Sequence, residues 1–314
     1  MRKAVIDLGT NTFHLFIVEI NEKELKALYK EKIAVKIGQN GISQGKIAPD
    51  AMKRALHTLM IYKSLIDQFE VEEVMGIATS AIRNAQNGQE LVDKILDQTG
   101  IKIEVISGAR EAELIFKGVK AAMNIGSNNQ LIMDIGGGSV EFIIGNNEEL
   151  LWKQSFEIGA QRLLDQFHKT DPMPKESLEE IFEFLDRELA PLRAAIKAYR
   201  PQSLIGCSGT FDTLCEIYKA ENGLATSPNN TVQSLPFDAY RDIHRDLLIK
   251  NKQERLAIPG MVSMRVDMIV VASCLISYVT EHLQTVKIMA SSYALKEGLL
   301  YESEQKPIAQ ALSQ

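Results

Sequence analysis

The sequence carries one short pattern twice, an acid followed by a turn of small and polar residues. Residues 7–12 read Asp-Leu-Gly-Thr-Asn-Thr, and residues 134–139 read Asp-Ile-Gly-Gly-Gly-Ser. Each copy lies between two apolar runs, which predicts a strand, a tight turn and a second strand. A turn without bulky side chains lets backbone N–H groups approach phosphate oxygens, and the acid beside it can hold a hydrated Mg²⁺. The pattern therefore predicts two phosphate-binding hairpins.

Three segments supply candidates for phosphate binding through backbone N–H and hydroxyl groups. They are the two turns and the small-residue segment 206–210, which reads Gly-Cys-Ser-Gly-Thr. The phosphate-contact candidates are Thr10, Asn11, Gly137, Gly138, Ser139, Ser208, Gly209 and Thr210. Asp134 is the stronger metal candidate, because it ends an apolar run where a lone carboxylate is costly to bury. Asp7 is its counterpart in the first copy.

A single hairpin of this kind has a plainer explanation, since Asp-X-Gly is also an ordinary hairpin turn. Its repetition, each time after an apolar strand, favours phosphate binding. Internal duplication of a phosphate-binding hairpin indicates an α/β fold of the two-domain actin-like ATPase type, which is ribonuclease H-like and has a central cleft. We expect domain I at residues 1–125 with a C-terminal helix at about 299–314, and domain II at residues 126–298.

Length, charge and cysteine content agree with such a protein. A chain of 314 residues exceeds the size at which one core usually keeps growing, so two domains are expected. The net charge of −6 disfavours loose binding to nucleic acid or to anionic membranes. The three cysteines lack metal-ligand spacing, and their odd count argues against a disulfide framework.

The sequence does not predict secretion or membrane insertion. Asp7 follows the initial Met closely and leaves no room for the apolar core of a signal peptide. The longest apolar stretch, residues 268–279, is too short to span a bilayer. A cytoplasmic protein with reduced, buried thiols is therefore expected.

Apolar periodicity predicts alternating strands and helices along the chain. The expected helices begin at residue 50 and cover residues 88–99, 109–124, 158–168, 174–198 and 292–301. The expected strands beyond the hairpins are residues 74–78, 103–106, 150–156, 204–205 and 286–289, with only helices between 211 and 282. We expect a left-handed Gly100 to end one helix and Pro191 to kink or divide another.

Six segments together resemble the motif series of one family, the exopolyphosphatase and guanosine pentaphosphate phosphohydrolase (Ppx/GppA) proteins. The segments are residues 6–17, 78–85, 106–112, 134–141, 206–210 and 294–298. They occur in the order found in the family and extend from residue 4 to about residue 300. The length of the chain is similar to that of the short, two-domain members.

The resemblance implies hydrolysis of a terminal phosphoanhydride with Mg²⁺. The substrate would be inorganic polyphosphate, or guanosine pentaphosphate losing its 5′ γ-phosphate. The family's proposed general base is the glutamate at the position of Glu111, next to Ala112. Many relatives carry a second acid where this chain has Arg110, which puts the basicity of Glu111 in doubt or adds a phosphate contact. The plainer role for Glu111 is to complement a helix dipole.

Two further charged residues are candidates for the same chemistry. Glu141 follows Asp134 by seven residues, shares a strand face with Ser139, and would orient water or metal. Its plainer interpretation is an exposed polar residue on an edge strand. Arg83 matches a family arginine and would offer a bidentate fork to phosphate, its alternative being a solvated surface charge.

A few residues remain open or favour a structural role. His14 lies between apolar neighbours and is expected to be a hydrogen-bonded structural histidine. Arg265 and Asp267 match a family Arg-X-Asp, where structural pairing and substrate contact are equally open.

The most economical interpretation is a phosphohydrolase that acts on inorganic polyphosphate. A guanosine pentaphosphate phosphohydrolase is the alternative enzyme, and a kinase with the same fold is less well supported because no acceptor site is evident. A non-catalytic, alarmone-binding or filament-forming actin relative is the alternative from another class. A homodimer is one expectation, because a long polyanion can be bound across two subunits.

Overall fold

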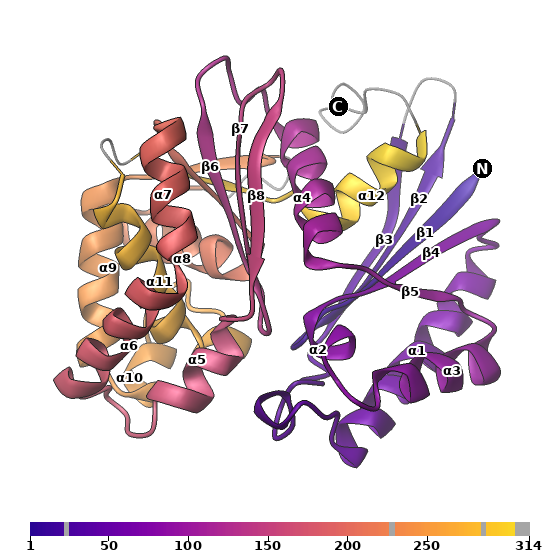
Figure 1. The fold of residues 1–314 in the computed structure, drawn as a ribbon. Coiled ribbons are helices and arrows are strands. Elements are labelled where there is room, and N and C mark those ends of the chain that lie inside the picture. The colour runs from indigo at the N-terminus through magenta and orange to yellow at the C-terminus, as the bar shows by residue number, and fades with distance from the viewer. Residues whose placement is uncertain (22–24, 226–229, 284–286, 305–314) are drawn as a thin grey trace. The chain divides into compact units, whose positions relative to one another are not determined.

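The computed structural model describes residues 1–21, 25–225, 230–283 and 287–304 (Figure 1). The chain forms two compact units. Unit 1 comprises Met1–Ala121 together with the C-terminal helix α12 (Leu295–Glu304), and unit 2 comprises Ala122–Ala294. Each unit is built around one mixed β-sheet.

The sheet of unit 1 has five strands in the order β3-β2-β1-β4-β5. The first three strands form an antiparallel meander, and β4 and β5 run parallel to β1. The strands are β1 (Arg2–Leu8), β2 (Phe13–Ile20), β3 (Leu25–Ile33), β4 (Glu73–Ala78) and β5 (Ile103–Val105).

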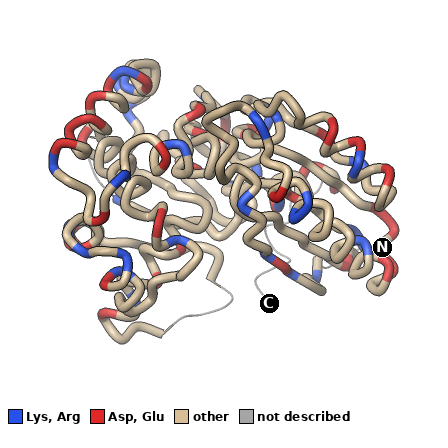
Figure 2. Tube along the Cα trace, turned by 90° about the horizontal axis from the view of Figure 1, so that it is seen from below, with Lys and Arg blue, Asp and Glu red and all other residues tan. Residues whose placement is uncertain are grey.

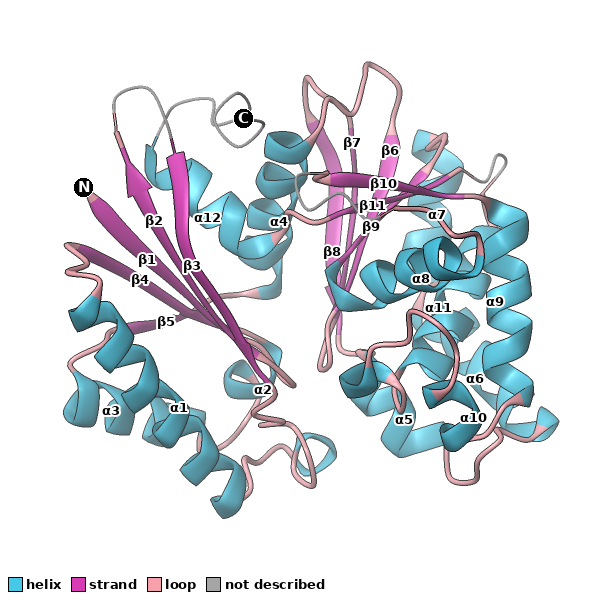
Figure 3. Cartoon of the chain, turned by 180° about the vertical axis from the view of Figure 1, so that it is seen from behind, coloured by secondary structure: helices cyan, strands magenta, loops and turns pink. Residues whose placement is uncertain are grey.

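Helices cover both faces of this sheet. Figures 1 and 3 show α1 and α3 against one face and α4 and α12 against the other. Alternate residues of β1 serve the two layers, since Ile6 lies in the core cluster with α1 and Val5 packs with Leu300 of α12. The helices of this unit are α1 (Pro49–Gln68), α2 (Ser80–Arg83), α3 (Gly88–Thr99), α4 (Gly108–Ala122) and α12.

The sheet of unit 2 has six strands in the order β10-β11-β9-β6-β7-β8. Strands β6 to β8 form an antiparallel meander, β9 and β11 continue the sheet in parallel, and β10 closes it antiparallel to β11. The strands are β6 (Gln130–Ile135), β7 (Val140–Gly145), β8 (Leu150–Phe156), β9 (Leu204–Cys207), β10 (Val232–Leu235) and β11 (Ile288–Ser291).

Apart from β10, the two sheets have the same order and the same strand directions. In each, an antiparallel meander of three strands is extended by two strands parallel to the first strand of the meander. This is the ribonuclease H-like order on which the actin-like duplication is built. The fold class predicted from the repeated hairpin is therefore confirmed.

The helices of unit 2 pack around a central apolar helix, α11. All of its residues from Ile269 to Ile276 are buried, and it contacts α5, α6, α8 and α9. The longest apolar stretch of the sequence is thus a core helix, and the described part of the chain contains no helix suited to crossing a membrane. The helices are α5 (Ala160–Phe167), α6 (Lys175–Glu188), α7 (Ala190–Tyr199), α8 (Ser208–Glu221), α9 (Phe237–Ile249), α10 (Lys252–Leu256) and α11 (Ile269–Glu281).

Most local predictions are confirmed. Gly100 ends α3 with a φ of 71°, and the predicted helix over residues 174–198 is divided at Leu189, with Pro191 in the first turn of α7. The three cysteines are buried and free. Figure 2 shows acidic and basic residues interspersed along the chain. Ion pairs within helices include Arg54–Asp50 in α1 and Lys94–Glu90 in α3.

One prediction for the second unit is wrong. Only helices were expected between residues 211 and 282, but β10 lies there. The strand is only four residues long and its pattern is too short to show alternation, so its pairing with the edge of β11 decides its conformation. The edge strand β3 was not predicted either, because most of its side chains are exposed or half-exposed and lack an apolar pattern.

Candidate active-site residues

The two predicted hairpins have closely similar backbones. In the first, Gly9 N–H donates to the Thr12 carbonyl at 3.2 Å, and a Cβ at Gly9 would lie 2.9 Å from that oxygen. In the second, a Cβ at Gly136 would lie 2.9 Å from the Ser139 carbonyl oxygen. Both turns are therefore too tight for a side chain at the equivalent position.

The carbonyl groups of the second turn are held by the N-terminus of α5. Gly159, Ala160 and Gln161 donate their N–H groups to the carbonyls of Gly138, Gly136 and Gly137 at 3.1, 2.9 and 2.9 Å. In a trans peptide the C=O and the next N–H point in opposite directions. The N–H groups of Gly137, Gly138 and Ser139 are therefore turned away from α5 as a row of donors, an arrangement that binds anions.

The first turn is held in a similar way by an irregular segment. The N–H groups of Lys36 and Gly38 donate to the carbonyls of Asn11 and Thr10 at 2.8 and 3.0 Å. By the same argument, the N–H groups of Asn11 and Thr12 are turned away from that segment. Thr10 and Asn11, the two predicted phosphate contacts in this turn, are also buried.

Asp134 lies where three predicted segments meet in unit 2. It is buried at the end of β6, is paired across the ladder with Glu141 of β7, and accepts a hydrogen bond from the Ser208 hydroxyl. Ser208 has a φ of 68°, a strained conformation for a residue with a side chain, in the turn from β9 into α8. Such strain tends to occur where function fixes the backbone.

Glu141 is buried, with 1% of its surface exposed, and β7 lies between two other strands. Its interpretation as an exposed residue on an edge strand is therefore wrong. Its Oε1 accepts a hydrogen bond from the Ser155 hydroxyl at 2.6 Å. Because Asp134 and Glu141 are direct cross-strand partners, the two carboxylates share one face of the sheet.

Arg265 lies against the first turn of α8. A Cβ at Gly209 would lie 2.4 Å from its Nη2, so only glycine leaves room for the guanidinium. Burial lowers the pKa of Arg265, and the charges of Asp212 and Asp134 oppose that shift. Asp267 instead pairs with Lys252 at 2.7 Å. The two charged residues of the Arg-X-Asp motif therefore have different surroundings. Arg265 lies near Asp134, whereas Asp267 pairs with Lys252.

Arg83 and Glu111 form an ion pair in unit 1. Arg83 Nη1 lies 3.0 Å from Glu111 Oε2 and also donates to the Ile106 carbonyl at 3.1 Å. The two side chains are 16% and 9% exposed, so Arg83 is not a solvated surface charge. Glu111 lies in the first turn of α4, where its N–H donates to the Ser107 carbonyl at 2.9 Å.

The model of the Ppx/GppA phosphatase family matches residues 16–307. The chain belongs to this family. This chain is 46% identical to an exopolyphosphatase from Cytophaga hutchinsonii whose crystal structure is known. The two structures match with a TM-score of 0.95, covering 97% of this chain and 98% of that one. This chain is 25% identical, with a TM-score of 0.80, to the Aquifex aeolicus family member, covering 97% and 98%.

A curated relative carries a different name. It is the guanosine-5′-triphosphate,3′-diphosphate pyrophosphatase of Photobacterium profundum, 28% identical over 303 residues, which are 96% of this chain. The match spans only 59% of that relative's length.

The donor set of the hairpins fits a magnesium ion shared with substrate. Within the described ranges, no group of three or more His, Cys, Asp and Glu side chains could hold a metal ion by itself. Mg²⁺ is usually bound through one or two carboxylates together with substrate phosphates and water. Asp134 and Glu141, which share a sheet face, match that requirement. Asp7 faces His14 instead, and the His14 ring bonds the Thr12 hydroxyl at 3.2 Å, the structural role expected for this histidine.

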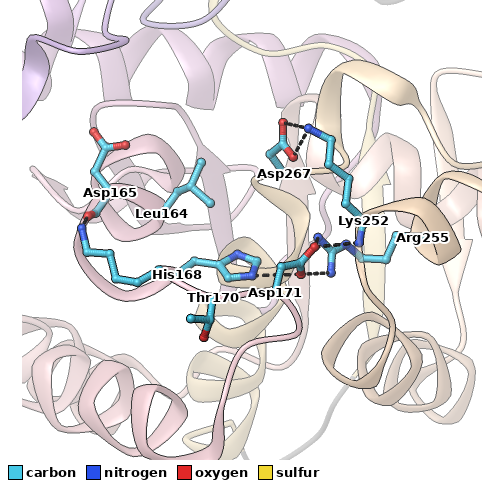
Figure 4. A pocket seen from close by; sticks show the side chains of 9 residues that line it. Leu164, Asp165, His168, Thr170, Asp171, Lys252, Arg255 and Asp267 are labelled. Carbon is cyan, nitrogen blue, oxygen red and sulfur yellow. Dashed lines mark hydrogen bonds and ion pairs between the residues drawn. The ribbon is translucent and has the colours of Figure 1, made fainter.

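A pocket of about 570 Å³ in unit 2 is lined by none of the predicted catalytic, phosphate-binding or metal-binding residues, although Asp267 of the Arg-X-Asp motif lies on its wall. Figure 4 shows Asp171 between His168 and Arg255, to which it is bonded at 3.2 and 2.7 Å. Lys252 donates its backbone N–H to the same carboxylate at 2.7 Å. Burial lowers the pKa of His168. The charged groups thus pair with one another and join the end of α5 to α10, which is a structural role.

Proposed function

We propose that this family member is a magnesium-dependent phosphohydrolase that removes the terminal phosphate from inorganic polyphosphate. The observation that carries the proposal is the ion pair between the buried Glu111 and the half-buried Arg83. A carboxylate can accept the proton of an attacking water, and a guanidinium can neutralise phosphate oxygens as the bond breaks. Glu111 also occupies the position of the family's proposed general base.

The other candidates would position and neutralise the substrate. Phosphoryl transfer needs in-line geometry and charge stabilisation more than covalent chemistry. The donor rows of the two turns would bind phosphate oxygens, and Arg265 would add charge beside Asp134. Asp134 and Glu141 would hold the magnesium ion, which when bound neutralises charge on the phosphates.

The similarity to a structure named as an exopolyphosphatase, over nearly the whole of both chains, supports polyphosphate as the substrate. The curated relative supports guanosine pentaphosphate, although the match covers only part of that protein. Both substrates offer a terminal phosphoanhydride to the same groups. Rates of phosphate release from the two, measured side by side with Mg²⁺, would choose between them.

Glu111→Gln tests the proposed base. The amide keeps the shape of the side chain but cannot accept the proton, so we expect kcat to fall about 100-fold or more with KM nearly unchanged. Phosphate release from polyphosphate is the measurement. Wild-type protein that binds polyphosphate but releases no phosphate from it or from guanosine pentaphosphate would favour the non-catalytic alternative.

A further inference from the structure

Arg110, the neighbour of the proposed base, joins the base-bearing helix α4 to the C-terminal helix α12. Its Nη1 donates to Glu302 Oε2 at 3.0 Å, and its Nη2 bonds the other oxygen of the same carboxylate. Lys117 of α4 bonds Glu302 as well. Arg110 is therefore engaged as a fork with α12, not with Glu111.

The contact between the two helices lies along one stripe of α4. Arg110, Leu114 and Lys117 follow the spacing of one helix face. At the middle of this stripe, a Cβ at Gly298 would lie 1.8 Å from the Leu114 carbonyl oxygen, so the backbone of α12 touches that of α4. The ion pairs to Glu302 thus hold α4 on both sides of the closest approach.

Helix α12 is itself fixed to the sheet of unit 1. Glu304 lies 2.7 Å from the buried ammonium of Lys3 on β1, and Glu73 of β4 lies 2.9 Å from the same group. Leu300 packs with Val5 in the small core on that face of the sheet. Because α12 is anchored to the sheet, its contacts with α4 fix the position of α4 relative to the sheet.

Arg110 lies in the first turn of α4, and the end turns of a helix are the parts most prone to fray. The Arg110 N–H donates to the Ser107 hydroxyl at 3.2 Å, and Glu111 follows in the same turn. Adjacent helical residues point about 100° apart. Arg110 can therefore be held on α12 while Glu111 is directed to Arg83.

We propose that Arg110 is a positioning residue, which fixes the first turn of α4 through Glu302 and so keeps the Glu111 carboxylate in place against Arg83. The proposal rests on Glu111 being the base of the proposed function. It assigns a role to the arginine that stands where many relatives have an acid, and the role needs no phosphate contact.

Three variants test the proposal against a purely structural role. Arg110→Met and Glu302→Gln should each lower kcat on polyphosphate about tenfold with KM changed less than about twofold, because small misplacements of catalytic groups are costly. Arg110→Lys keeps the charge but not the fork, so it should recover part of the lost kcat. Lys117→Met is the matched control, since it removes one bond to Glu302 but leaves the Arg110 fork, and its kcat should stay within about twofold of wild type.

Amide hydrogen exchange supplies a readout that does not depend on activity. In Arg110→Met the amides of residues 111–113 should exchange faster than in wild type, and in Lys117→Met they should not. Lowered thermal stability with unchanged kcat and unchanged exchange would overturn the positioning role. A wild type that releases no phosphate would defeat the proposed function instead, while the exchange comparison would still decide whether Arg110 fixes the turn.

Discussion

The two hairpins have closely similar backbone conformations and differ in the residue that faces the acid. Asp7 is paired across the ladder with His14, whereas Asp134 is paired with Glu141. The first hairpin thus sets one carboxylate beside an imidazole, and the second sets two carboxylates on one face. Both turns offer backbone N–H groups for a phosphate, but the second hairpin offers two carboxylates to a divalent cation where the first offers one.

The support of the two turns differs as well. Carbonyls of the second turn accept hydrogen bonds from the first N–H groups of α5, and Arg162 adds a bond to the Gly138 carbonyl at 2.8 Å. The first turn is held by the irregular segment that contains Lys36 and Gly38. The hairpin with the carboxylate pair is thus the one held by a helix N-terminus. We therefore expect substitutions in its support to destabilise the protein more than substitutions in the support of the first hairpin.

The comparison is tested most strongly by the two aspartates. Asp134→Asn should lower kcat about 100-fold or more and raise the Mg²⁺ concentration needed for half-maximal rate, because the carboxylate is proposed as a metal ligand. Asp7→Asn should shift the Mg²⁺ requirement far less. Phosphate release titrated with Mg²⁺ after treatment with EDTA is the measurement. Equal shifts in the two variants would mean that the hairpins share the metal role.

Two glycines test the difference in support. A Cβ at Gly159 would lie 2.4 Å from the Gly137 carbonyl carbon, which is backbone, whereas a Cβ at Gly38 would lie 2.5 Å from the Thr10 Cγ2 atom, which a change of the Thr10 χ1 angle can move. Gly159→Ala should therefore lower the free energy of unfolding by about 1–3 kcal/mol, and Gly38→Ala by less. Urea unfolding measures both. A larger loss of unfolding free energy in Gly38→Ala than in Gly159→Ala would mean that the first turn is the more tightly held of the two.

The sequence predicted the parts of the site that are local in the chain. Each hairpin is one continuous segment, so its strands, its glycine and the places of Asp7 and Asp134 follow from apolar periodicity and turn composition. The burial of Glu141 was not predicted, because it depends on β8 pairing with the second edge of β7, which places Glu141 inside the sheet. An alternating pattern shows which residues share a face but does not show which face is covered.

The charge pairs could not be predicted, because the fold joins distant positions. Arg83 and Glu111 are 28 residues apart, and Arg110 and Glu302 are 192 residues apart. The motifs indicated that Arg83, Glu111 and Arg265 matter without showing their partners. Pairing of β5 with β4 and packing of α12 on α4 supply those partners, and no local rule contains that information.

The two units should also differ in their response to acid. In unit 1, hydrogen bonds from Arg110 and Lys117 lower the pKa of Glu302 to about 2, against the opposing effect of burial. A lowered carboxyl pKa contributes stability that is present above the unfolded value of about 4.5 and is lost as the pH falls toward 2. The link between α4 and α12 should therefore survive at pH 5.

In unit 2, the half-buried His244 should make the protein less stable at the same pH. Burial lowers the pKa of His244 to about 4, and its Nδ1 lies 2.9 Å from the Ser273 hydroxyl oxygen. That hydroxyl donates to the Val270 carbonyl, so it accepts a hydrogen bond from the Nδ1–H of the imidazole. Between pH 6.5 and 4, His244 is protonated in the unfolded chain but not in the folded chain, so the free energy of unfolding falls as the pH falls.

His244→Asn isolates this effect, because the amide can donate to Ser273 but does not titrate. From the lowered pKa, wild type should lose about 2 kcal/mol of unfolding free energy relative to the variant between pH 7 and pH 5. Urea unfolding at the two pH values gives that difference, and amide exchange at pH 5 should show α9 and α11 opening before α4 and α12. If wild type and His244→Asn lose the same amount, this histidine does not set the response. If α4 and α12 open first, the acid-sensitive part of the molecule is unit 1.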